Sequence, residues 1–131
     1  ARMFMGTIWL EGVMKKLTLL TCAAFFALTG AAWAEFQKLD SQRDFVSVVE
    51  GKTLTRPLVE LRVTESGGIS GTGAVWDVSG QWVWKGGYFC RSLIWGDDDL
   101  GYNCQEVAVN GGKIRFTSDK GAGQSAVFSL K

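Results

Sequence analysis

The centre of the sequence reads QWVWKGGYFCRSLIW over residues 81–95. Trp82 and Trp84 alternate with other residues, so both indoles share one face of an extended chain and Val83 lies on the other. The Gly-Gly pair that follows can take the positive φ angles of a tight two-residue turn. Residues 88–95 then run back as a second strand. This stretch predicts an antiparallel hairpin, and the hairpin sets the fold class.

Further strands are predicted on both sides of this hairpin. Alternation of apolar and polar residues indicates strands over residues 59–63, 69–78, 102–109, 113–118 and 125–130. Glycine-rich turns separate them at 65–68, 79–80 and 110–112. We therefore predict a mainly β fold, an antiparallel meander closing into a small barrel or a strongly curved sheet, because closure removes exposed strand edges. A two-sheet sandwich is the alternative.

One short helix is predicted before the first strand. Ser41 is suited to cap its start, because a serine hydroxyl can accept a hydrogen bond from a free backbone N–H. Phe45, Val48 and Val49 fall on one face, and Gly51 is placed to end the helix. The valines are weak helix formers, so we expect this N-terminal helix to pack on the sheet or to cap one end of the barrel.

The N-terminal part of the chain has the three regions of a cleavable export signal. Met14-Lys15-Lys16 supplies a start and a short cationic region, an uncharged and mostly apolar run covers 17–29, and Ala32-Trp33-Ala34 offers small residues where signal peptidase reads. We predict cleavage after Ala34. Residues 1–13 are then an upstream extension, 14–34 a signal peptide and 35–131 a single mature β-rich domain.

A membrane anchor is the alternative interpretation of the apolar run. At thirteen residues the run falls short of the roughly 20 that cross a bilayer, and it ends in a cleavage-type triplet. We therefore expect a periplasmic or secreted protein that keeps no membrane span after cleavage.

Two cysteines belong to the predicted mature domain. Cys22 would leave with the signal, which leaves Cys90 and Cys104. If residues 88–95 and 102–109 are hairpin partners, these two cysteines face each other within reach of a disulfide. An oxidising compartment favours the bond. A redox-active pair is the alternative, but such pairs commonly have Cys-x-x-Cys spacing, so we predict a structural disulfide.

Several kinds of chemistry have no support in the sequence. There is no histidine, which removes Ser-His-Asp and Cys-His catalysis. Asp97-Asp98-Asp99 resembles the start of a calcium loop, but Tyr102 and Ala108 stand where an EF-hand needs glycine and glutamate. We predict no catalytic residue, no metal site and no cofactor. With 14 Lys and Arg against 13 Asp and Glu and no basic stretch, we expect no nucleic-acid partner.

Aromatic residues crowd the middle of the chain and suggest a ligand site. Such residues can line a pocket in which one charged side chain anchors a small ligand. The alternative is that they only fill the core. The candidate ligand-binding residues are Trp82, Trp84, Arg91, Trp95 and Tyr102.

Two segments of the chain resemble a known family. They are Leu54-Thr55-Arg56-Pro57-Leu58 and the pattern of Trp82-x-Trp84, Phe89-Cys90-Arg91 and Tyr102-Asn103-Cys104-Gln105. With these motifs the chain resembles small exported bacterial proteins of obscure function, often labelled dihydrodipicolinate reductase, and it is similar in pattern to lipocalin-like domains. The label implies a reductase with a nicotinamide cofactor on a Rossmann domain. The sequence has neither βαβ alternation nor a Gly-x-Gly-x-x-Gly turn, so no catalytic residue is carried over.

Three functions follow as hypotheses. The first is an exported barrel that binds a small apolar or aromatic ligand. The second is an envelope interaction protein or inhibitor that acts through an exposed face. The third is the reductase that the family label implies. A cavity of roughly several hundred Å³ lined by the tryptophans would favour the first. A contiguous exposed apolar patch would favour the second.

Overall fold

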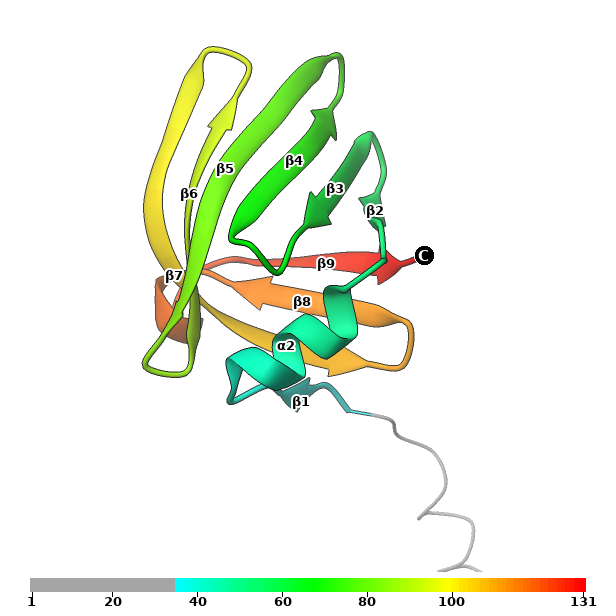
Figure 1. The fold of residues 1–131 in the computed structure, drawn as a ribbon, viewed down its shortest axis with the longest axis vertical. Coiled ribbons are helices and arrows are strands. Elements are labelled where there is room, and N and C mark those ends of the chain that lie inside the picture. The colour runs from blue at the N-terminus through cyan, green and yellow to red at the C-terminus, as the bar shows by residue number, and fades with distance from the viewer. Residues whose placement is uncertain (1–34) are drawn as a thin grey trace, which may run out of the picture. The chain divides into compact units, whose positions relative to one another are not determined.

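Nine antiparallel strands form one sheet in residues 35–131, the part of the chain that the computed structural model describes (Figure 1). The strands are β1 (Gln37–Lys38), β2 (Leu54–Arg56), β3 (Val59–Val63), β4 (Gly68–Gly73), β5 (Trp76–Lys85), β6 (Tyr88–Trp95), β7 (Asp98–Asn110), β8 (Lys113–Thr117) and β9 (Ser125–Leu130). The predicted extension, signal peptide and Cys22 lie outside the described residues. The predicted mainly β fold is confirmed.

The sheet closes into an eight-stranded barrel. Each strand from β2 to β9 pairs with the next along the chain, and the first and last of them pair with each other, with Leu54 opposite Leu130. Closure is reinforced by two backbone hydrogen bonds of 2.9 Å between Thr53 and Lys131. The predicted meander therefore forms a closed barrel, and neither an open curved sheet nor a sandwich describes it.

The longest strand, β7, serves two neighbours in turn. Its first part pairs with β6, from Asp98 to Gln105, and its second part pairs with β8, from Glu106 to Asn110. The short β1 pairs with the second part of β7 where β6 no longer reaches. Every strand from β2 to β9 thus has a partner on both sides.

The predicted helix is present as α2 (Gln42–Val49), the one α-helix in residues 35–131. Ser41 caps it as expected, its hydroxyl accepting a hydrogen bond of 3.2 Å from the Asp44 N–H. Gly51 follows with φ of 70°. The helix lies across one end of the barrel (Figure 1), and its buried Phe45 and Val49 join the barrel core.

The core is built from the inward-facing side of the strands and from α2. Phe45 is fully buried in it, with its ring 5.0 Å from that of Phe89, 5.2 Å from that of Trp82 and 5.3 Å from that of Trp84 between centroids. Edge-to-face and offset contacts at these distances add to the area that the rings bury. The aromatic residues of the 81–95 hairpin therefore hold the helix on the barrel.

One predicted turn is in the wrong place. Residues 69–78 were expected to form one strand ending at a turn at 79–80, but the turn falls at Ala74 and Val75, and β5 continues through Gly80. A Cβ at Gly80 would collide with the carbonyl oxygen of Ser92 on β6. This glycine therefore permits a close approach of two strands and does not mark a turn.

The acidic segment is also more regular than predicted. Residues 96–101 lie between the predicted strands 88–95 and 102–109, yet β7 already begins at Asp98, which pairs with Trp95. The register shifts between Leu93 and Ile94, so Leu100 is the extra residue of a β-bulge. Aspartate is depleted in strands, and for that reason the sequence pattern favoured a loop here.

The predicted disulfide joins Cys90 of β6 to Cys104 of β7. The two residues are directly opposite in the ladder, with Cα atoms 3.9 Å apart. Ser92 and Tyr102 are paired two residues further along, as this register requires. The hairpin pairing inferred from the two cysteines is confirmed.

Candidate functional site

The barrel interior holds an apolar cavity of about 170 Å³. It lies between strands from both sides of the barrel, and most of its walls are aliphatic or aromatic. The lining residues are Leu54, Leu61, Val63, Ile69, Phe89, Arg91, Leu93, Gln105, Phe116, Ala126 and Phe128. An engineered apolar cavity of about 150 Å³ holds benzene, whereas drug-sized ligands need about 300 Å³ or more. The space therefore suits one small ring or a short branched chain.

Arg91 brings the only positive charge to the cavity lining. Its Nη1 donates a hydrogen bond of 3.0 Å to the Gly101 carbonyl oxygen on β7. The ion pairs in residues 35–131 are formed by Lys38 with Asp40 and by Arg43 with Asp44, so Arg91 has no carboxylate partner there. Burial lowers the pKa of the Arg91 guanidinium, because a low-dielectric surrounding disfavours the charged form.

Gln105 is the second polar residue of the lining. It is buried, and its Nε2 donates a hydrogen bond of 3.2 Å to the Ser118 hydroxyl. This contact gives the side-chain amide a partner within the protein. Arg91 is thus the polar group of the cavity whose charge is not balanced.

The structure does not bring the five predicted ligand-binding residues together. Trp82 and Trp84 share the inward face with Arg91, but both pack against Phe45 of α2, and neither lines the cavity. The Trp82 Nε1 also donates a hydrogen bond of 2.9 Å to the Thr64 carbonyl oxygen. Of the five, Arg91 alone lines the interior cavity.

Trp95 lies at the opposite end of the barrel from α2. Its Nε1 donates a hydrogen bond of 2.9 Å to the Gly73 carbonyl oxygen, and its ring meets that of Trp76 edge to face, with centroids 6.4 Å apart. About a third of its surface is exposed. Trp95 is not part of the lining of the cavity around Arg91.

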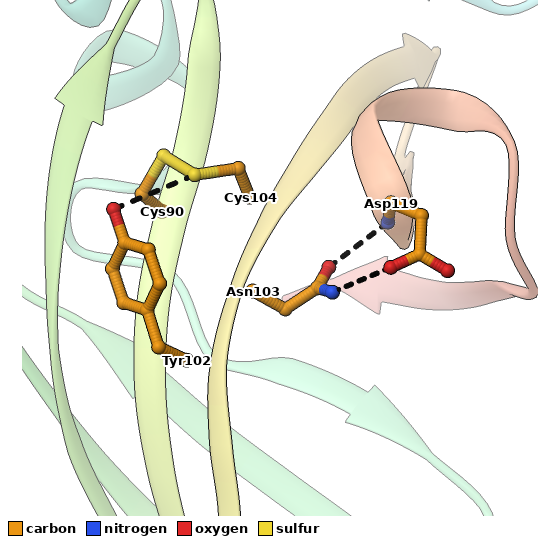
Figure 2. The surroundings of a disulfide bond; sticks show 5 residues. All are labelled: Cys90, Tyr102, Asn103, Cys104 and Asp119. Carbon is orange, nitrogen blue, oxygen red and sulfur yellow. Dashed lines mark hydrogen bonds between the residues drawn. A yellow bond between two sulfur atoms is a disulfide. The ribbon is translucent and has the colours of Figure 1, made fainter.

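Tyr102 points to the outer face of the barrel. Figure 2 shows its side chain on the same side of β7 as the disulfide, whereas Asn103 turns the other way and exchanges two hydrogen bonds with Asp119. The outer hollows beside Tyr102, shared with Gln81 and Ser92, are broad and open to solvent. A small ligand there would stay largely hydrated, whereas ligand sites usually bury most of the ligand surface.

Several cavity residues were not among those predicted from the sequence. Phe89 and Leu93 flank Arg91 at every second position of β6, so strand alternation alone places all three side chains on one face. That signal was present in the sequence. The contributions of Phe116 and Phe128 depend on barrel closure, and no local pattern reveals them.

The described residues contain no group of three or more His, Cys, Asp or Glu side chains placed to hold a metal ion. Within residues 35–131, no helix has the length and apolarity needed to cross a bilayer. No protein-family model, curated protein sequence or solved structure matches the chain.

Proposed function

We propose that this chain is an exported barrel protein that binds a small apolar molecule carrying one acidic group. The apolar part occupies the interior cavity, and the acidic group binds the Arg91 guanidinium. The observation that carries the proposal is a partly buried cation, without a carboxylate partner in residues 35–131, on the wall of an otherwise apolar cavity.

The charge of Arg91 argues for an anionic ligand. A guanidinium has five N–H donors, and here the hydrogen bond to the neutral Gly101 carbonyl uses one of them. A carboxylate can accept two donors of the planar fork at once, and such charge-assisted bonds are about twice as strong as neutral ones. A ligand carboxylate would therefore offset the cost of burying Arg91 without an opposite charge.

The size of the cavity limits the apolar part of the ligand. A volume of about 170 Å³ excludes a long acyl chain, and the tryptophans that were expected to enlarge the pocket are packed elsewhere. Small aryl or short-chain carboxylates fit both the volume and the charge. Benzoate and hexanoate are the probes that we select.

Calorimetric titration of the purified protein tests this proposal. We expect benzoate to bind more tightly than toluene, since only benzoate engages Arg91. The variant Arg91→Met keeps an unbranched apolar stem and removes the charged guanidinium, and it should weaken benzoate binding by about tenfold or more. Arg62→Met, on an exposed residue of β3, is the matched control and should leave the affinity unchanged.

Two outcomes would overturn the proposal. One is equal benzoate affinity in wild type and Arg91→Met. The other is an absence of heat with all three compounds, which would identify the cavity as a gap in packing.

Export is the second part of the proposal. The disulfide supports it, because such bonds form and persist in oxidising compartments. Intact mass measurement on protein recovered from the periplasm of a bacterial host should find a chain that begins at Glu35. Protein that stays in the cytoplasm with its N-terminal segment intact would contradict this part alone.

A further inference from the structure

The end of the barrel opposite α2 is formed by three neighbouring turns, β2–β3, β4–β5 and β6–β7 (Figure 1). The Ala74 N–H donates a hydrogen bond of 2.7 Å to the Leu58 carbonyl oxygen, and the Gly96 N–H donates one of 2.8 Å to that of Asp77. We call this region the hairpin end. It carries most of the exposed large apolar side chains of residues 35–131, namely Leu58, Val75, Trp76, Ile94, Trp95 and Leu100.

Trp76 and Trp95 are fixed in place on this surface. The Trp95 ring lies against Gly73, where an added Cβ would come within 3.1 Å of the indole. The Trp76 ring lies against Gly96 in the same manner, and a Cβ added at Gly96 would come within 3.0 Å of that indole. Each indole thus occupies space beside the backbone that the side chain of any other residue would crowd. A surface ordered in advance loses little conformational entropy when a partner binds.

The two indoles border a hollow of about 320 Å³, which Asp97 and Asp98 also line. These aspartates form no ion pair in residues 35–131, where the pairs involve Asp40 and Asp44. Arg56, at the end of β2, lies over the Phe128 ring, 5.6 Å from its centroid. The hollow therefore joins two indole rings to carboxylates whose charge is not balanced, and both kinds of group attract a cation.

We propose that the hairpin end is a docking surface for a segment of another protein that presents an arginine or lysine side chain between apolar side chains. The cation enters the hollow between the indoles and the two carboxylates. The apolar neighbours cover exposed residues such as Val75 and Leu100. Clusters of exposed tryptophan are typical of the few residues that supply most of the affinity at protein interfaces.

Charge complementarity selects this occupant over two others. A second copy of the chain would bring the aspartates of both copies into one symmetric interface, since both copies use the same patch. An anionic lipid surface would be repelled by the same carboxylates. The proposal concerns a surface distinct from the Arg91 cavity, so it holds whether or not that cavity binds a ligand.

Nuclear magnetic resonance titration of protein purified after expression of residues 1–131 tests the docking surface. The probe is the peptide acetyl-Gly-Leu-Arg-Leu-Gly-amide, and its matched control has citrulline, a neutral isostere, in place of arginine. We expect the arginine peptide to shift the indole N–H signals of Trp76 and Trp95 and to leave those of Trp82 and Trp84 in place. The citrulline peptide should bind about tenfold more weakly.

Paired variants make the test specific. The double variant Asp97→Asn, Asp98→Asn should weaken the arginine peptide by about tenfold, and added salt should reduce binding to wild type. The double variant Asp40→Asn, Asp44→Asn removes the same charge near α2 and should change nothing. Arg91→Met should also leave peptide binding intact.

Four results would overturn the proposal. These are no shift with the arginine peptide, equal binding of the two peptides, indole shifts caused by phosphatidylglycerol vesicles, and a protein dimer that the substitution Trp76→Ala dissociates.

Discussion

The two ends of the barrel use aromatic side chains in opposite ways. At the helix end, Phe45 inserts among Trp82, Trp84 and Phe89 and is fully buried. At the hairpin end, Trp76 keeps 55% of its surface exposed. The sequence shows one continuous cluster of aromatics. Their burial separates a group that stabilises the fold from a pair that is available to a partner.

The largest expected effect of a substitution lies at the helix end. Phe45→Ala removes the ring that four aromatic side chains contact, and it should lower the free energy of unfolding by about 3–5 kcal/mol. Urea denaturation followed by tryptophan fluorescence measures the loss. Val75→Ala, at an exposed residue of the hairpin end, is the control and should cost less than about 0.5 kcal/mol. Similar losses in the two variants would break the comparison of the two ends.

The disulfide joins the two strands that carry the β6–β7 turn of the hairpin end. Its sequence separation is 14 residues, so closing this loop is worth about 3 kcal/mol in the chain-entropy model. Cys104→Ser should lower thermal stability accordingly under oxidising conditions and should differ little from wild type once both are reduced. Equal melting temperatures for oxidised wild type and Cys104→Ser would show that the disulfide does not stabilise the fold.

A smaller effect on stability than that of the lost disulfide is expected for Trp76→Ala. Because more than half of the side chain is already in water, the free energy of unfolding should fall by less than about 1 kcal/mol. Binding of the arginine peptide should nevertheless be lost. A stability loss as large as that of Phe45→Ala would show that Trp76 stabilises the fold as a core residue does. The aromatic side chains of the two ends would then have the same role.

Much of the fold could be predicted because local signals agreed with it. The Ser41 cap, the glycine pair of the 81–95 hairpin and the opposed cysteines each depend on residues close in sequence or on one register. The errors arose where the role of a residue depends on a contact with a residue far away in the sequence. Gly80 reads as a turn but makes room for Ser92, and the bulge at Leu100 lets an acidic segment continue as a strand.

The candidate site was predictable only in part. Arg91 was predicted as the polar anchor of a ligand site, and it lines the interior cavity. Trp82 and Trp84 were grouped with it because strand alternation places all three on one face. Alternation cannot say how far along the barrel each side chain lies, or that Phe45 takes up the space beside the two indoles.

The pairing of β2 with β9 has a consequence for how the chain folds. Leu54 meets Leu130 across nearly the whole length of the domain, so the ring stays open until the last strand is available. A chain that emerges N-terminus first, from a ribosome or through a translocation channel, must hold seven strands with two free edges until that moment. Non-local pairing of this kind slows folding and exposes edges to wrong partners. Deletion of the six residues of β9 should therefore unfold the whole domain. Deletion of a tail that pairs with no strand would leave the rest of the domain folded.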